Sequence, residues 1–349
     1  MENYMRTTLI AAAVLGALSA TAFADGSVQL YGQVNVVGIY SDNGLNNGTA
    51  STKKLSIDQG NTPSRIGFKG EEDLGDGLKA WFQIETRVNT DDAANSAFAS
   101  REGWVGLQGD FGKVGLGRGK TPYTNVADTF DGLVDGARNL AIYSPDSVIS
   151  NRFDNAIRFD SASFSGLTFA AMYGTGETKD DAAKLDNNDK VSLAVRYTAG
   201  PLFLAAAYNN ETNGVNPDTK VNPDKKAENG RDSTGYLLAG TYTIDAIKLG
   251  LGYQRAEKEA AAVKFKRDSF VTTVSYAMGP TTLKGGAIFG SKAKVAGVSQ
   301  DNSQFVRYTI GAKHALSKRT AALVEFSGDE TKGNNADPKA LSVGLLHSF

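Results

Sequence analysis

The chain follows an alternating rhythm from about residue 26 to its last residue. Stretches of roughly ten residues with alternating apolar and polar side chains are separated by connections that are in turn short and long. The short connections are residues 73–77, 109–112, 165–166, 199–201, 245–246, 279–280 and 316–318. The long connections lie near residues 41–63, 88–100, 119–153, 175–188, 210–233, 257–267, 291–302 and 328–339. These fifteen connections predict an all-β fold, a sixteen-stranded antiparallel transmembrane β-barrel with tight turns at one rim and long loops at the other.

The composition agrees with a barrel and excludes several other classes of protein. A net charge of −1 provides no basic field for nucleic acid. The absence of cysteine excludes disulfides and cysteine-based metal sites, and no cofactor is predicted. Only 41% of the residues are hydrophobic and the mean hydropathy is −0.28, too polar for a helical membrane protein. A barrel needs apolar residues on one face of each strand only, so this value is expected.

Residues 1–24 read as a secretory signal peptide. Arg6 supplies a positive start, an apolar run covers residues 9–18, and Ala22-Phe23-Ala24 fits the small-x-small cleavage rule. We therefore expect cleavage between Ala24 and Asp25. The mature chain, residues 25–349, is then a single barrel domain.

The alternation assigns the two faces of most strands. In the first strand, the expected lipid-facing residues are Val28, Leu30, Val34 and Val36, and the expected lumen-facing residues are Gln29, Tyr31, Gln33 and Asn35. Residues 78–87, 191–197 and 270–278 repeat this pattern. Aromatic residues near strand ends suit the two membrane interfaces: Tyr173, Tyr197, Tyr208, Tyr242, Tyr276 and Phe326. The strands around Trp104 and residues 200–208 alternate less cleanly, and their facing stays open.

The chain ends in a further alternating stretch, residues 341–349, whose last residue is Phe349. A terminal strand that pairs with the first strand removes both sheet edges, as a bilayer requires. Glycines at 32, 38, 70 and 106 are expected on the outer face of the early strands. Because small residues allow close approach in membranes, this wall is predicted to pack against other copies.

Several segments resemble the general porins of Gram-negative outer membranes, especially the betaproteobacterial branch. They are residues 28–32 (VQLYG), 64–78 (SRIGFKGEEDLGDGL), 101–107 (REGWVGL) and 111–118 (FGKVGLGR), together with Phe349. The resemblance implies a homotrimer in the cell outer membrane, with one channel per subunit for passive diffusion of ions and small hydrophilic solutes. It also implies contact with lipid and lipopolysaccharide, and with the barrel-assembly machinery through the C-terminal strand.

In that family the third long loop folds inward and narrows the channel, and here this loop is about residues 119–153. Its acids include Asp128, Asp131 and Asp135, and Phe130 and Leu133 are candidates to pack it against the wall. The family's basic wall matches Arg65, Arg101 and Arg152, with Lys69, Glu85 and Arg87 as other lumen charges. Opposed charges across a narrow passage create a transverse field that sets size and charge selectivity. Lys79, Arg158 and Arg196 are further candidates for a basic lumen, and the sign of ion selectivity stays open.

Two other functions compete with a channel. A barrel plugged by its third loop would serve as an adhesin or structural envelope protein, and would need apolar residues packed inside. A barrel enzyme would need a histidine beside a nucleophile, but His314 and His347 lie near turns without such a motif. Acidic loop stretches such as residues 180–189 and 329–330 are weak candidates for divalent ions. The sequence favours a channel without enzymatic activity.

Overall fold

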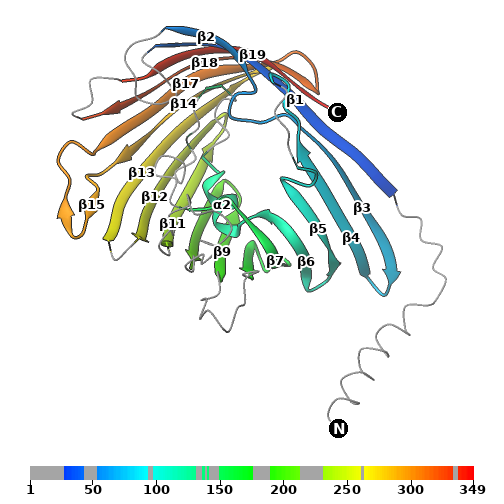
Figure 1. Cartoon of the computed structure of the whole chain (residues 1–349). Coiled ribbons are helices and arrows are strands. Elements are labelled where there is room, and N and C mark those ends of the chain that lie inside the picture. Colours follow the sequence, from blue (N-terminus) through cyan, green and yellow to red (C-terminus); the bar gives the residue numbers. More distant parts are fainter. Residues whose placement is uncertain are drawn as a thin grey trace, which may run out of the picture.

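The computed structural model describes residues 27–42, 53–92, 97–130, 136–137, 140, 149–175, 189–212, 231–260, 263–332 and 337–349. The strands are β1 (Ser27–Asp42), β2 (Lys54–Asp58), β3 (Arg65–Gly75), β4 (Leu78–Arg87), β5 (Glu102–Gly109), β6 (Gly112–Lys120), β7 (Arg152–Ser161), β8 (Leu167–Gly174), β9 (Lys190–Ala199), β10 (Leu202–Glu211), β11 (Arg231–Ile244), β12 (Ile247–Ala260), β13 (Val263–Met278), β14 (Thr281–Gly290), β15 (Lys294–Val295), β16 (Val298–Ser299), β17 (Phe305–Ala315), β18 (Thr320–Thr331) and β19 (Lys339–Ser348). One helix among the described residues, α2 (Pro122–Ala127), lies inside the ring of strands (Figure 1).

Sixteen of these strands form a closed antiparallel barrel, as predicted. Each pairs with the next along the chain, from β1 through β3 to β14 and then β17 to β19, and β19 pairs back with β1. The short strands β2, β15 and β16 belong to loops at the long-loop rim. All seven predicted short connections join neighbouring strands at the other rim, which we call the tight-turn rim.

The ring closes where the last residue meets the first strand. Phe349 N donates to Gly32 O at 3.0 Å, and Gly32 N donates to Phe349 O at 3.1 Å. A Cβ atom at residue 32 would lie 2.5 Å from the Phe349 ring, so only glycine admits this ring. The ring therefore covers the place where the two ends of the sheet join.

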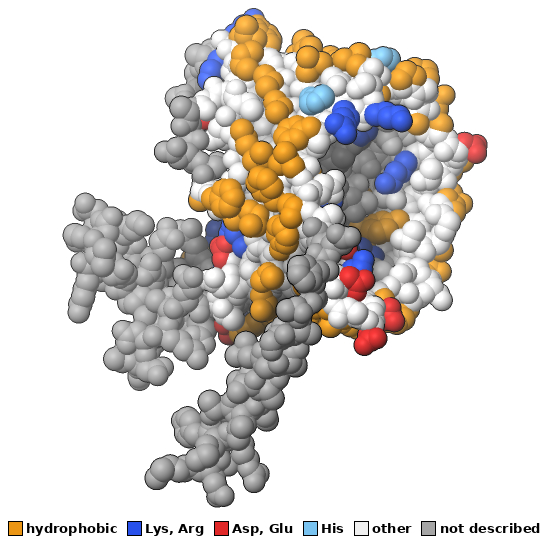
Figure 2. All heavy atoms as spheres, turned by 90° about the vertical axis from the view of Figure 1, so that its right-hand side faces the viewer, with side chains coloured by type: hydrophobic (Ala, Val, Ile, Leu, Met, Phe, Trp, Pro, Cys, Tyr) orange, Lys and Arg blue, Asp and Glu red, His pale blue; other side chains and the backbone are white. Residues whose placement is uncertain are grey.

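The observed faces agree with the alternation. Large apolar residues point outward and are exposed, including Leu30, Val195 and Phe270, while residues of the inner face such as Asn35 and Ser192 are buried. Hydrophobic side chains gather in a band on the outer wall (Figure 2). The two undecided strands are also settled: Trp104 and Ala205 face inward.

Two expectations were wrong. Residues 257–267 are mostly strand rather than loop, because β12 continues to Ala260 and β13 already begins at Val263. Gly106 lies on the lumen face, where a Cβ atom would lie 2.8 Å from Trp81 Nε1. Gly32 and Gly70 do lie outward, but the rings of Phe349 and Phe82 cover them. These glycines therefore receive aromatic rings of the same chain.

Strand length differs around the ring. β5, β6 and β8 have 8, 9 and 8 residues, whereas β11 and β12 have 14 each. At about 3.3 Å per residue, five residues correspond to roughly 16 Å along a strand. At the long-loop rim, β5 and β6 therefore end closer to the tight-turn rim than β11 and β12 do. The third loop begins at the end of β6, on this shorter part of the wall. Within the described ranges, no helix is long and apolar enough to cross a membrane.

A charge placed on the outer wall should destabilise the barrel strongly. Leu251 on β12 is 68% exposed and lies between Tyr253 and the tight-turn rim, so Leu251→Arg puts a cation into lipid. We expect the free energy of unfolding in bilayers to fall by about 2–4 kcal/mol, measured by urea titration of tryptophan emission. Leu251→Ala is the control, and an equal loss in both variants would contradict the lipid-facing assignment.

Candidate functional site

The third loop enters the lumen through α2, which the local sequence specifies. Thr121 caps the helix: its Oγ1 accepts a hydrogen bond from Thr124 N at 3.1 Å. Pro122 occupies the first turn, where its missing N–H costs nothing. Asp128 closes the other end, and its N–H donates to Thr124 O at 2.8 Å. The loop therefore begins as a short rigid element inside the barrel.

Polar contacts hold this helix against the wall of β9 to β12. Tyr123 N donates to Ser192 Oγ at 3.1 Å, and Tyr123 Oη donates to Gln254 Oε1 at 2.8 Å. All three side chains are buried. Burial raises the pKa of Tyr123 well above its ordinary value, so its hydroxyl keeps this donor proton at any physiological pH.

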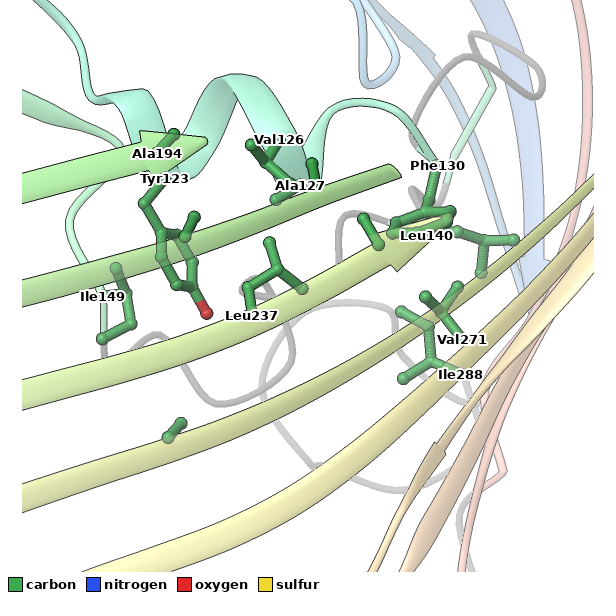
Figure 3. Close-up of a cluster of buried hydrophobic side chains, with 14 of the residues drawn as sticks. Tyr123, Val126, Ala127, Phe130, Leu140, Ile149, Ala194, Leu237, Val271 and Ile288 are labelled. Atoms are coloured by element: carbon green, nitrogen blue, oxygen red, sulfur yellow. The ribbon is translucent and has the colours of Figure 1, made fainter. Parts of the chain in front are cut away.

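An apolar surface on the same wall receives the loop (Figure 3). Side chains from the loop pack on small or apolar inward residues of β8 to β14. The loop contributes Tyr123, Val126, Ala127, Phe130, Leu140 and Ile149, and the wall contributes Ala170, Ala194, Ala205, Ala207, Leu237, Ala239, Ala256, Val271 and Ile288. We call these wall residues the receiving wall.

Glycines on this wall make room for the largest loop side chains. A Cβ atom at Gly252 would lie 2.6 Å from the Phe130 ring, and one at Gly286 would lie 2.7 Å from Leu140. The expected packing role of Phe130 is therefore visible, whereas Leu133 lies outside the described residues.

Two buried acids hold other points of the loop. Glu211 accepts hydrogen bonds from Ser150 N at 2.7 Å and Ser150 Oγ at 2.5 Å. Glu325 accepts one from Gly136 N at 3.3 Å, and Asn61 Nδ2 donates to Gly136 O at 3.0 Å. The loop is thus attached to β10, to β18 and to the loop after β1.

The wall of β3 to β7 carries the predicted arginines. Arg101 Nε donates to Glu85 Oε1 at 2.5 Å, and Arg65 Nε lies 3.5 Å from Glu85 Oε2. The Glu85 side chain is only 8% exposed, and those of Arg65 and Arg101 are 28% and 13% exposed. One carboxylate therefore joins two of the predicted basic residues.

A second carboxylate, Glu102, stands directly across from Glu85 in the sheet. Arg152 Nε lies 3.6 Å from Glu102 Oε1 and donates to Arg101 O at 2.8 Å. Trp104 Nε1 donates to Glu102 Oε2 at 2.8 Å. All three predicted arginines thus belong to one cluster around two acids, which we call the arginine cluster.

The remaining predicted charges make other contacts. Lys69 Nζ lies 5.4 Å from the centre of the Tyr31 ring. Arg87 stands directly across from Arg65 in the sheet and is exposed at the loop end of β4. Asp128 forms an ion pair with Lys120. Asp131 and Asp135 lie outside the described residues, as do the cleavage residues Ala24 and Asp25.

No arrangement typical of catalysis or metal binding is present among the described residues. His314 Nδ1 lies 2.8 Å from Thr281 Oγ1, and His347 Nδ1 lies 2.9 Å from Thr320 Oγ1. No three histidine and acidic side chains of the described ranges gather to hold a metal ion. Asp329, one of the candidates for binding a divalent ion, accepts two hydrogen bonds from Arg307, at 2.7 and 3.0 Å.

Sequence reasoning missed Glu102 and the receiving wall. Glu102 follows Arg101 within the quoted REGWVGL segment, and it lies on the same face as Trp104, whose facing the sequence leaves open. The receiving wall is signalled by small residues at alternate positions of β10 to β12, opposite large outward side chains.

A closed barrel with an apolar outside, a charged wall and an inward loop defines a transmembrane β-barrel channel. A family model of the Gram-negative porins matches residues 11–334. The chain belongs to this family and is an outer-membrane channel for passive diffusion. It is 29% identical to the major outer membrane protein P.IB of Neisseria sicca and 29% identical to an outer membrane porin protein of Bordetella pertussis. Each match covers 99% of this chain and 100% of the relative.

Solved structures show the same fold. An anion-selective porin from Comamonas acidovorans matches with a TM-score of 0.75 at 22% identity, over 93% of this chain and 100% of that one. OmpT of Vibrio cholerae in a trimer form matches with a TM-score of 0.69 at 17% identity, over 93% and 99%.

A side chain at residue 252 should displace the loop. In Gly252→Val the new side chain meets the Phe130 ring, so we expect the free energy of unfolding to fall by about 1–3 kcal/mol. We also expect an altered single-channel conductance, measured in planar bilayers. Gly240→Val is the matched control, because Gly240 faces outward and its nearest contact is the flexible end of Leu204. If both variants conduct like the wild type, the loop does not depend on this contact.

Proposed function

We propose that the third loop and the arginine cluster form the constriction of the pore, with the loop on one side and Arg65, Arg101 and Arg152 on the other. The observation that carries this proposal is the division of the lumen into two walls. The receiving wall is apolar and anchors the loop, and the wall of β3 to β7 is charged. Solutes then pass between an anchored loop and a row of guanidinium groups.

The charged wall supports a selective role for the constriction. Arginine stays charged beside other cations, which suits a cluster of three. Glu85 and Glu102 pair with the guanidinium groups, at 2.5 Å for Arg101, 3.5 Å for Arg65 and 3.6 Å for Arg152. The loop acids Asp128, Asp131 and Asp135 belong to the same proposal as the opposing charges. A field across the passage aligns polar solutes and disfavours apolar ones, which must disrupt ordered water.

We extend the proposal to export and assembly. Residues 1–24 act as a signal peptide cleaved between Ala24 and Asp25, and residues 25–349 form the mature barrel. The barrel assembles as a homotrimer, as OmpT of Vibrio cholerae does in its trimer form. Its outer face contacts lipid and lipopolysaccharide, and its last strand, ending at Phe349, is recognised by the barrel-assembly machinery.

We propose no enzymatic activity. Each histidine of the chain contacts a threonine near the tight-turn rim. Neither contact includes the orienting third group that an activated nucleophile needs.

Single-channel current in a planar bilayer with a salt gradient tests the channel directly. We expect current steps grouped in threes, one group for each inserted trimer, with a linear current–voltage relation. A folded protein that conducts nothing would favour the plugged barrel. The receiving wall gives the plugged barrel a structural basis, because its apolar surface can hold a loop inside the lumen.

The arginine cluster should bias the channel against cations. In the double variant Arg65→Ala and Arg101→Ala, two positive charges leave the wall and Glu85 loses both partners. We expect the permeability ratio of cations to anions to rise severalfold, read from the reversal potential in a potassium chloride gradient.

Arg255→Ala is the control for this measurement. Arg255 faces outward near the loop rim, where it pairs with Asp268 at 2.8 Å. An unchanged reversal potential in the double variant, or an equal shift in the control, would remove Arg65 and Arg101 from the constriction.

A further inference from the structure

The first long connection turns inward after β2 and packs on the inner face of β1. Residues 59–64 form this turn, which we call the inner turn, and it leads into Arg65, the first residue of β3. Gly60 has a φ of 62°, a left-handed conformation that favours glycine. Gln59 and Ser64, at the two ends of the turn, are 7% and 0% exposed. The inner turn is therefore anchored in the interior at both ends.

One side chain, Gln59, ties the inner turn to itself and to a neighbouring loop. Its Oε1 accepts a hydrogen bond from Ser64 N at 3.1 Å, across the turn. Its Nε2 donates to Asn89 Oδ1 at 3.0 Å and to Asp91 Oδ1 at 2.9 Å, in the loop after β4. Its backbone O accepts from Asn35 Nδ2 at 2.7 Å, on β1. The Gln59 amide thus uses its oxygen and both of its N–H donors on other parts of the chain.

The inner face of β1 holds the rest of the turn. Asn35 Nδ2 also donates to Thr62 O at 3.1 Å. Gln33 Nε2 donates to Thr62 O at 3.4 Å and to Pro63 O at 3.3 Å. Ser64 Oγ accepts from Asn35 N at 2.9 Å and donates to Asn35 O at 3.1 Å. Because buried polar groups are costly to leave unpaired, these contacts keep the inner turn in one position.

The inner turn presents Asn61 to the third loop. Asn61 N donates to Gly136 O at 2.8 Å, and Asn61 Nδ2 donates to the same oxygen at 3.0 Å. Both bonds are possible because a carbonyl oxygen has two lone pairs. Glu325 accepts from Gly136 N at 3.3 Å, so Asn61 makes the two shorter of these three contacts. The next residue, Ala137, packs on an apolar cluster of β1, β18 and β19, formed by Val37, Ile39, Leu323 and Ala340.

The same turn leads directly into the arginine cluster. Ser64 O accepts a hydrogen bond from Val88 N at 2.9 Å, just before the cluster begins at Arg65. Arg65 Nε in turn lies 3.5 Å from Glu85 Oε2. Arg65 follows Asn61 by four residues, which span at most about 14 Å when fully extended. One short segment therefore connects the third loop to the charged wall.

We propose that the inner turn positions the third loop relative to the arginine cluster and thereby sets the open width of the channel. The inference rests on the proposed constriction, whose two sides the turn connects. Phe130 and Leu140 hold the third loop to the receiving wall on either side of Gly136 in the sequence. Asn61 is a positioning residue that acts through Gly136, and Gln59 is one that acts through the turn itself.

The absence of cysteine allows the position of the third loop to be measured directly. Ala137→Cys places a thiol beside Gly136, and its labelling by a maleimide on the folded protein reports how often this part of the loop leaves its site. We expect Asn61→Leu and Gln59→Leu each to raise the labelling rate about fivefold, because each removes hydrogen bonds and adds no charge.

Planar bilayers show whether the same hold sets the width. In the chain without the introduced cysteine, Asn61→Leu and Gln59→Leu should each increase the fluctuations of the open-channel current about twofold or more. Both variants should also admit larger neutral polymers than the wild type does. Neither substitution changes a charge, so a change in the polymer cut-off reports width rather than selectivity.

A double variant separates positioning from a general loss of stability. Gln59→Leu combined with Asn61→Leu should label little faster than either variant alone, because both act through one contact, whereas independent effects would multiply. Asn210→Leu is the matched control. Asn210 Nδ2 donates to Thr234 Oγ1 at 3.0 Å and joins β10 to β11 near the long-loop rim, so its loss should leave labelling and current unchanged.

An unchanged labelling rate in Asn61→Leu or Gln59→Leu would overturn the inference, as would an equal rise in Asn210→Leu. Effects that multiply in the double variant would overturn it too. Faster labelling with an unchanged current and polymer cut-off refutes the proposed constriction, and with it the control of width. The labelling needs no current, so a barrel that conducts nothing refutes the channel and leaves the measured hold on the third loop standing.

Discussion

The whole structure depends on the need to pair every backbone N–H and C=O group within the membrane. Lipid offers no hydrogen-bond partners, so a sheet in a bilayer must close on itself. Here β19 pairs with β1 over ten residues, and the last residue completes the ring through Gly32. Gly32 is required because the Phe349 ring lies where its Cβ atom would be. Closure then fixes an inside and an outside for every strand.

A closed ring of sixteen strands is too wide for wall side chains to fill. Its lumen is partly filled by the third loop, and this explains the small residues on β8 to β14. Ala205, Ala207 and Gly252 leave space that Tyr123 and Phe130 occupy. The outward residues of the same strands stay large because they meet lipid. One alternating pattern thus serves lipid on one face and the loop on the other.

The strands, their turns and most facings could be predicted because they depend on a two-residue period and on local turn residues. The three arginines were also found from the sequence, through a resemblance, and they do gather in one cluster. Glu102 was missed because its ion-pair partner Arg152 lies on β7, far from it in the sequence. Gly106 was placed outward because a glycine carries no side chain to indicate its face, and only the position of Trp81 decides it. Residues 200–208 alternate poorly because their inner face is small and apolar where it meets the loop.

In the proposed constriction, the two walls of the lumen divide the tasks of stability and selection. The receiving wall holds the loop by apolar packing and by hydrogen bonds such as Tyr123 to Gln254, which do not depend on salt. The charged wall pairs each arginine of the cluster with an acid, and the three arginine side chains stay partly exposed. Packing alone on both sides would close the lumen, and charge alone would leave the loop without an anchor. In the proposed constriction, a loop anchored mainly on the receiving wall and facing charges on the other wall lets the barrel stay both folded and open.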